Sequence, residues 1–327
     1  MHLFLDTNIY LSVYKLSGDD LEELRKLAVT VRSGDTMLYL TEHGEDEFRR
    51  NRAGTIAESL KTVEAASVPK SYPQLMRNLG GFAQLRDTFT SFERQRADLV
   101  EEARAAALRQ DLQADRLVQE LFGIARHLPV SDEISTAAND RHRRGNPPGK
   151  KDSVGDALNW ECLLGAVPEG EDLVLVTADK DYLSKLDATT LDEFLVDEWR
   201  DRKGSAISVY DSLTALFKAH YPNIRLAADL ERNLAIEDLI TSANFRKTHL
   251  AIQRLSAFAD FTPEEAQALV EAANTNSQIS HILEDDDVRT FYLALVERFR
   301  ETLPPESLAQ LLAAMEEAIS GARVEEE

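Results

Sequence analysis

Short apolar runs, rich in residues that favour β-strands, recur along the first two-thirds of the chain. They occupy residues 3–5, 37–40, 173–176, 194–196 and 206–209. Their length and sharp boundaries are typical of buried strands. Between the runs, apolar residues such as Leu21, Leu24 and Leu27 recur every three or four positions, as on one face of a helix. This alternation predicts an α/β fold with a doubly wound, mostly parallel sheet.

One long interval breaks the alternation between strands and helices. It is charged and rich in alanine, and its apolar residues, among them Phe82, Leu85 and Phe89, fall at helical spacing. We therefore expect a helical insertion at about residues 72–135, within an N-terminal domain that spans residues 1–225.

The last hundred residues show only helical patterns. Thr262 and Glu265 form a capping-box sequence, with Pro263 at the first helical position. We expect an all-α C-terminal domain at residues 228–327. Its amphipathic helices are candidates for forming a homo-oligomer or for binding a regulatory protein.

The chain is strongly acidic, with a formal net charge of −21. Residues 228–327 hold 20 acidic and 8 basic residues, a net −12. Such a chain binds polyanions poorly, so a nucleic-acid substrate needs local basic patches and metal ions. The single cysteine, Cys162, excludes an intrachain disulfide and a cysteine-rich zinc site. No apolar stretch reaches the roughly 18 residues of a membrane span, and no leader pattern opens the sequence, so we expect a soluble cytoplasmic protein.

Acidic residues follow three of the predicted strands, at the edge where open α/β sheets bind their ligands. Asp6 ends the first run, Glu47 lies shortly after the second, and Asp179 and Asp181 follow the run at 173–176. Each acid alone has an ordinary structural explanation as a helix cap or as a solvated residue of a first helical turn.

A fourth acidic segment contains Asp152 and Asp156, which are four residues apart and so share one helix face. Two like charges at this spacing destabilise a helix unless a cation lies between them or one is a cap, and Asp152 as an N-cap stays an alternative. Four to six carboxylates gathered at one edge would raise one another's pKa and would suit a hard divalent cation. The sequence therefore predicts a Mg²⁺ or Mn²⁺ site.

Four segments together resemble the acidic motifs of the PIN nuclease superfamily and occur in the family's order. The segments are Phe4-Leu5-Asp6-Thr7-Asn8, Glu45-Asp46-Glu47-Phe48, Gly155-Asp156-Ala157-Leu158-Asn159-Trp160-Glu161 and Val176-Thr177-Ala178-Asp179-Lys180-Asp181-Tyr182. The resemblance covers about residues 2–220. Within the superfamily, the chain is similar to the bacterial PIN-like branch with a long helical insertion. It implies a metal-dependent nuclease whose four core acids are Asp6, Glu47, Asp156 and Asp179.

The resemblance also assigns supporting positions. Asp152 and Asp181 match positions that are acidic in some members, and Asn8 and Thr177 match polar groups that orient the core acids. Glu45 and Asp46 stay alternatives to Glu47, because a shift of the helix start changes which acid faces the sheet edge.

We hypothesise that Asp6 and Asp156, with Asp179, hold one divalent cation that activates a water for in-line attack on phosphorus. Glu47 would help to hold a second cation, and cleavage would leave a 5′ phosphate.

Two basic segments flank the predicted acids and are candidates for binding the phosphates of a nucleic acid, with RNA expected before DNA. Their residues are Arg49, Arg50, Arg52, Arg143, Arg144, Lys150 and Lys151. The alternative explanation is that these cations only balance an acidic surface.

Other enzyme classes fit the sequence less well. A phosphatase with an aspartyl nucleophile needs a second Asp two residues after Asp6, where Asn8 stands. The sequence does not match the phosphate-binding loop of an NTPase, because no Ser or Thr follows Lys150. A catalytically inactive PIN-like scaffold, a DNA-directed nuclease, and an RNase that acts as a toxin or defence effector stay open.

Overall fold

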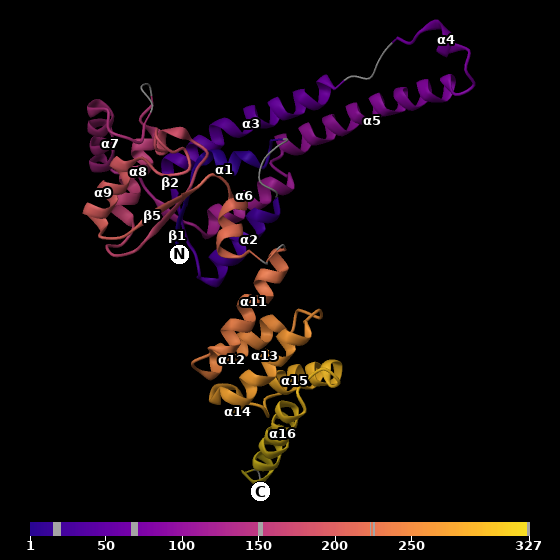
Figure 1. Ribbon diagram of the computed structural model, residues 1–327, viewed down its shortest axis with the longest axis vertical. Helices are drawn as coiled ribbons and strands as arrows, with labels where there is room; N and C mark the ends of the chain where they lie inside the picture. Colours follow the sequence, from indigo (N-terminus) through magenta and orange to yellow (C-terminus); the bar gives the residue numbers. More distant parts are fainter. Residues whose placement is uncertain (16–20, 67–70, 150–152, 223, 225, 326–327) are drawn as a thin grey trace. The chain divides into compact units, whose positions relative to one another are not determined.

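The computed structural model describes residues 1–15, 21–66, 71–149, 153–222, 224 and 226–325 (Figure 1). The chain divides into two compact units, residues 1–223 and 224–327. Within the described ranges, no helix is both long enough and apolar enough to cross a membrane.

A five-stranded parallel sheet forms the centre of the first unit, in the order β3-β2-β1-β4-β5. The strands are β1 (His2–Leu5), β2 (Met37–Thr41), β3 (Arg126–Leu128), β4 (Leu173–Val176) and β5 (Ile207–Tyr210). The chain builds outward from β1 to β3 and then returns to the other side of β1 with β4 and β5. The strand order therefore reverses between β1 and β4, where open sheets form a ligand-binding crevice.

Helices cover both faces of this sheet (Figure 1). They are α1 (Thr7–Ser12), α2 (Leu21–Ser33), α6 (Gln113–Ile124), α7 (Asp132–Arg144), α8 (Gly155–Ala166), α9 (Glu193–Lys203) and α10 (Leu213–His220), with a 3-10 turn η1 (Lys180–Tyr182). α8 packs on α7 and α9, whereas α2 packs on α6 and α10. The fully buried Trp160 and Trp199 join α8 and α9 to Phe4 and Leu175 of the sheet in one apolar core.

Two features of the sheet differ from the sequence prediction. Residues 194–196, expected as a strand, lie in α9, because Leu195 and Trp199 are buried one helical turn apart while Phe194 is exposed. Residues 126–128, expected within the helical insertion, form the edge strand β3, which has a single buried residue, Leu128. The α/β fold with a parallel sheet is otherwise confirmed.

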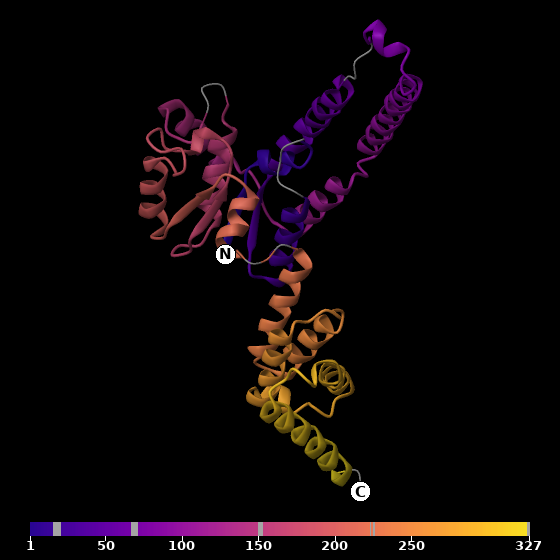
Figure 2. The same ribbon diagram turned by 45° about the vertical axis from the view of Figure 1, so that its right-hand side comes forward.

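The helical insertion is a two-helix arm. Figures 1 and 2 show α3 (Glu42–Ala65) and α5 (Phe82–Leu108) running side by side away from the sheet, with the short α4 (Gln74–Arg77) near their outer end. The two long helices contact each other, and Tyr72 packs on Phe82 and Phe89 near the tip. The arm begins within the helix that carries Glu47, earlier in the chain than residue 72.

The second unit is entirely helical, as expected. Its helices are α11 (Ala227–Ile240), α12 (Phe245–Leu255), α13 (Pro263–Thr275), α14 (Ser277–Ser280), α15 (Asp286–Phe299) and α16 (Pro305–Glu325). The expected capping box starts α13, with the Thr262 backbone N–H donating to Glu265 Oε2 at 2.7 Å. These helices enclose an apolar core of their own, separate from that of the sheet.

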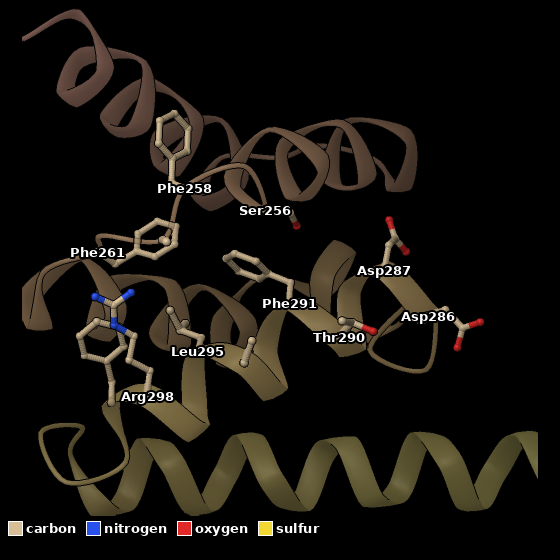
Figure 3. Close-up of a pocket in the computed structure, with 12 residues that line it drawn as sticks. Ser256, Phe258, Phe261, Asp286, Asp287, Thr290, Phe291, Leu295 and Arg298 are labelled. Atoms are coloured by element: carbon tan, nitrogen blue, oxygen red, sulfur yellow. The ribbon is translucent and has the colours of Figure 1, made fainter.

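An apolar groove of about 620 Å³ lies between the loop after α12 and helix α15 (Figure 3). Phe258, Phe261 and Phe291 line it, with Arg298 toward one end and Asp287 toward the other. Neighbouring helices already cover most of Phe261 and Phe291. The groove is therefore a depression in the surface of this core, with a largely apolar lining.

Candidate metal centre

The carboxyl ends of β1 and β4 bring Asp6 next to Thr177. The Asp6 backbone N–H donates to Val176 O at 2.9 Å, so Asp6 extends the ladder between β1 and β4 by one residue. Thr177 Oγ1 donates to Asp6 Oδ2 at 2.6 Å, and Asn8 Nδ2 donates to the same oxygen at 2.8 Å. Both polar residues that the sequence proposed as supports thus orient the Asp6 carboxylate.

Asp6 is held in an environment that disfavours its negative charge. The residue is 4% exposed. Burial raises the pKa of its carboxyl group to about 6, the hydrogen bond from Thr177 opposes this, and the charges of Glu47 and Asp179 raise it further. Because charge effects of this kind fall off with distance, Glu47 and Asp179 must lie near Asp6.

Three further carboxylates form a compact group beside this strand end. Asp156, Asp179 and Asp181 offer oxygen atoms that all lie within 4.8 Å of one another. The turn after β4 fixes two of them, because Asp179 Oδ1 accepts from the Asp181 backbone N–H at 3.1 Å and Thr177 Oγ1 accepts from that of Asp179 at 3.0 Å. The first turn of α8 supplies the third, Asp156.

Helix α3 brings Glu47 toward the same edge. Thr41 caps the helix by accepting from the Gly44 backbone N–H at 3.0 Å. Of the neighbouring acids, Asp46 is exposed and Glu45 pairs with Arg49, whereas the charge of Glu47 acts on Asp6. This geometry favours Glu47 over its two neighbours as the acid of this helix.

A buried polar chain links the three elements that carry Glu47, Asp156 and Asp179. Thr41 Oγ1, at the start of α3, donates to Asn159 Oδ1 of α8 at 2.6 Å. Tyr182, in η1, is hydrogen-bonded to Asn159, and its pKa is raised well above the ordinary value, first by burial and then by the charges of the nearby acids. Sequence reasoning missed this chain, although a polar residue between Leu158 and Trp160 on an apolar helix was a usable signal.

His43 and Gly155 set how closely α3 approaches α8. A Cβ atom placed on Gly155 would overlap the imidazole of His43. His43 is one turn before Glu47, and Gly155 directly precedes Asp156, so this contact lies between two of the core acids. Burial lowers the pKa of His43, and the charge of Glu47 opposes the shift.

The variant Gly155→Ala should therefore separate the two helices or displace the His43 ring. We expect a loss of about 1–3 kcal/mol of unfolding free energy, the usual effect of overpacking, together with weaker Mn²⁺ binding. Removing the ring in His43→Ala/Gly155→Ala should restore both, as measured by urea unfolding and calorimetric titration. Gly165→Ala on the same helix is the matched control, since nothing lies within 4 Å of its added Cβ. An unchanged Gly155→Ala protein would contradict this account of the contact.

The chemistry of these side chains fits a divalent cation with oxygen ligands. Five carboxylates gather at one sheet edge, and the pKa of Asp6 is raised first by burial and then by the charges of Glu47 and Asp179, effects that a bound cation would offset. Hard cations such as Mg²⁺ and Mn²⁺ take carboxylate oxygens as ligands. Asp6, Asp156, Asp179 and Asp181 are the residues that would hold the ion, with Glu47 beside them.

The raised pKa of Asp6 predicts how the metal-free protein responds to pH. The folded state binds the Asp6 proton more tightly than the unfolded chain does, so this stability is fully present below about pH 4 and is lost as the pH rises through about 6. A shift from 3.8 to about 6 corresponds to roughly 3 kcal/mol. In EDTA, Asp6→Asn should therefore gain stability over the wild type between about pH 4 and 8 in urea unfolding. A difference that is constant over this range would contradict the buried, repelled carboxylate.

The predicted phosphate-binding cations divide into different environments. Arg49, Arg50, Arg143 and Arg144 are exposed. Arg52 is not a surface cation, which corrects its proposed role: its guanidinium is largely buried and pairs with Asp115 at 2.6 Å. Lys150, Lys151 and Asp152 lie outside the described residues.

Comparison with known proteins agrees with the geometry of the N-terminal unit. Residues 3–182 match the family model of the PIN domain, which is more than half of the 327-residue chain. Neither a curated protein nor a solved structure matches the sequence. The family is typically one of metal-dependent nucleases, and the matched segment contains every carboxylate of the candidate site. By this match, the chain belongs to the PIN domain family.

Proposed function

We propose that the protein is a divalent-metal-dependent nuclease that hydrolyses phosphodiester bonds, with RNA as its substrate. The observation that carries the proposal is the convergence of acids from four separate segments at the point where the strand order reverses. Acids that serve only as helix caps or as solvated surface residues need not lie close together, whereas acids that bind one cation must.

Each residue of the site has a part in the proposed reaction. Bound Mg²⁺ or Mn²⁺ would supply Lewis acidity toward water and toward a phosphate oxygen. Asp6, Asp156, Asp179 and Asp181 would hold the ion, with Glu47 beside them, and Thr177 and Asn8 fix the orientation of Asp6. The family resemblance and the dense carboxylates favour this role over a catalytically inactive scaffold.

Substrate binding in this proposal relies on local cations, because the whole chain is acidic. Arg49 and Arg50 follow Glu47 within one turn of α3 and are exposed. Arg143 and Arg144 end α7, ahead of the segment that leads to α8. These arginines would contact phosphates rather than bases, so they predict little sequence preference.

The test is cleavage of end-labelled single- and double-stranded RNA and DNA with Mn²⁺, with Mg²⁺ or with EDTA. The proposal expects cleavage of RNA with either cation, none with EDTA, and a 5′ phosphate on the product. If the protein cleaves DNA in preference to RNA, the proposed substrate is wrong, but the proposed metal-dependent hydrolysis of phosphodiester bonds stands. Absence of cleavage together with absence of Mn²⁺ binding in calorimetry would overturn the proposal in favour of a scaffold.

A further inference from the structure

Helix α5 of the arm leaves one row of large apolar side chains uncovered. Leu85, Phe92 and Leu99 are 37%, 47% and 63% exposed, respectively. Arg96 lies 5.7 Å from the centroid of the Phe92 ring and still leaves it exposed to this extent. Val100, on the face of α5 toward α3, is buried. The contact between α3 and α5 thus covers one face of the helix and leaves the neighbouring row without cover.

The spacing of the row is that of a helix-packing seam. Its members are seven residues apart, which on a helix of 3.6 residues per turn keeps them in a narrow stripe that drifts by about 20° per repeat. Such a stripe fits a second helix that runs along α5. A small-molecule pocket or a flat protein surface would not require this periodicity.

Charge around the stripe points to a protein helix as its occupant. The residues along its outer border are uncharged and polar over the first three turns, at Gln84, Thr88, Ser91 and Gln95, and the same two rows end at the acids Asp98 and Glu102. Across α4 and α5 (residues 74–108) five basic and five acidic residues cancel: Arg77, Arg86, Arg94, Arg96 and Arg104 against Asp87, Glu93, Asp98, Glu101 and Glu102. A nucleic acid would call for a basic face, and a basic partner for an acidic one.

The stripe is also complementary to itself. It is symmetric about Phe92, with a leucine seven residues to either side. An antiparallel copy of α5 therefore pairs Leu85 with Leu99 of the other copy, and Phe92 with Phe92. A two-fold axis generates contacts of this kind. Because residues 74–108 carry no net charge, two copies of α5 can approach without net repulsion between them, although each whole chain carries −21.

We propose that the arm is a homodimerisation element, in which α5 of two copies packs antiparallel through Leu85, Phe92 and Leu99. Each copy contributes α3 and α5, so the interface is a four-helix bundle. This assigns self-association to the arm rather than to the C-terminal helices, and it does not depend on nuclease activity.

The first test is the mass of the full-length chain in solution, by light scattering and sedimentation over a range of concentrations. The wild type should be a dimer, and Phe92→Glu/Leu99→Glu should be a monomer. Its melting temperature should equal that of the wild type at dilutions at which the wild type dissociates, because both residues are exposed in the single chain. Leu108→Glu is the matched control: this leucine is 82% exposed on the same helix but lies off the stripe, and its variant should stay dimeric. A monomeric wild type, or a dimeric Phe92→Glu/Leu99→Glu, would overturn the proposal.

The second test introduces a new cysteine on the stripe. The natural cysteine, Cys162, is buried and should form few intermolecular disulfides of its own. Under mild oxidation, Phe92→Cys should form an intermolecular disulfide rapidly, because the two-fold axis places residue 92 of both copies together. Leu108→Cys should remain monomeric on a non-reducing gel. Equal crosslinking of the two variants would contradict the antiparallel arrangement.

Discussion

Replacing Asp156 by asparagine should lower divalent-dependent cleavage by more than about a hundredfold, and replacing Asp6 should do the same. Losing an outer partner of a metal ligand typically costs about 10–100-fold, and these two acids are proposed as ligands themselves. Asparagine keeps the shape of the side chain but removes the negative charge that holds the cation. The measurement is single-turnover cleavage of labelled RNA at saturating enzyme and fixed Mn²⁺, with Mn²⁺ affinity determined in parallel by calorimetry.

Asp46→Asn is the matched control for these variants, since Asp46 is exposed on the same helix as Glu47. Its cleavage rate should stay close to that of the wild type, whereas Glu47→Gln should be strongly impaired. Full activity in Asp156→Asn or in Asp6→Asn would refute their role as ligands. Full activity of Glu47→Gln together with loss of activity in Asp46→Asn would identify Asp46, and not Glu47, as the second core acid.

Part of the site could be predicted from the sequence because two of its acids closely follow strands. Asp6 and Asp179 come one and three residues after β1 and β4, and parallel strands bring their carboxyl ends to one edge. The positions of these two acids along the chain thus place them at the same edge, whereas the placement of Asp156 and Glu47 depends on how α8 and α3 pack. Only the choice among Glu45, Asp46 and Glu47 needed the structure, because a helix rotates neighbouring residues by about 100°.

Other elements could not be derived from local pattern. β3 has one buried residue, and its pairing with β2 depends on partners 87 positions away, as in Tyr39 with Arg126. Residues 194–196 look like a strand because three apolar residues stand together, yet Asp192 caps a helix there through the Phe194 backbone N–H. In β3 long-range pairing decided the structure, whereas at residues 194–196 the signal was a local helix cap that the run of apolar residues obscured.

The sequence did not show which arginines are exposed and which are buried, because burial depends on partners distant in sequence. Arg49 and Arg52 stand in one basic run, but the first is exposed and the second reaches Asp115 of α6. Arg141 likewise belongs to a run of cations at the end of α7 and is nevertheless buried. A basic run in the sequence therefore does not define a binding surface until the burial of each cation is known.

Arg141 holds α7, α8 and α9 together, as well as the segment before α8. Its Nε donates to Glu161 Oε1 at 2.8 Å, and its other nitrogens donate to Glu198 Oε2 at 2.7 Å and to Pro147 O at 2.6 Å. Trp160 Nε1 adds a hydrogen bond to the same Glu198 oxygen at 2.8 Å. One guanidinium thus satisfies two largely buried carboxylates and anchors the helix that carries Asp156.

Replacing Arg141 by methionine should therefore give the largest loss of stability of any single change considered. The variant leaves Glu161 and Glu198 without their cation, and removing one partner of a buried pair costs about 3–5 kcal/mol. In a unit of this size, such a loss lowers the melting temperature by roughly 6–20 °C. Thermal and urea unfolding would measure this loss. Arg200→Met is the control, because Arg200 pairs with Asp197 on the exposed side of α9 and its replacement should change stability by less than about 1 kcal/mol. Equal stability of the two variants would show that Glu161 and Glu198 do not need Arg141, and α8 would then have to be positioned by apolar packing alone.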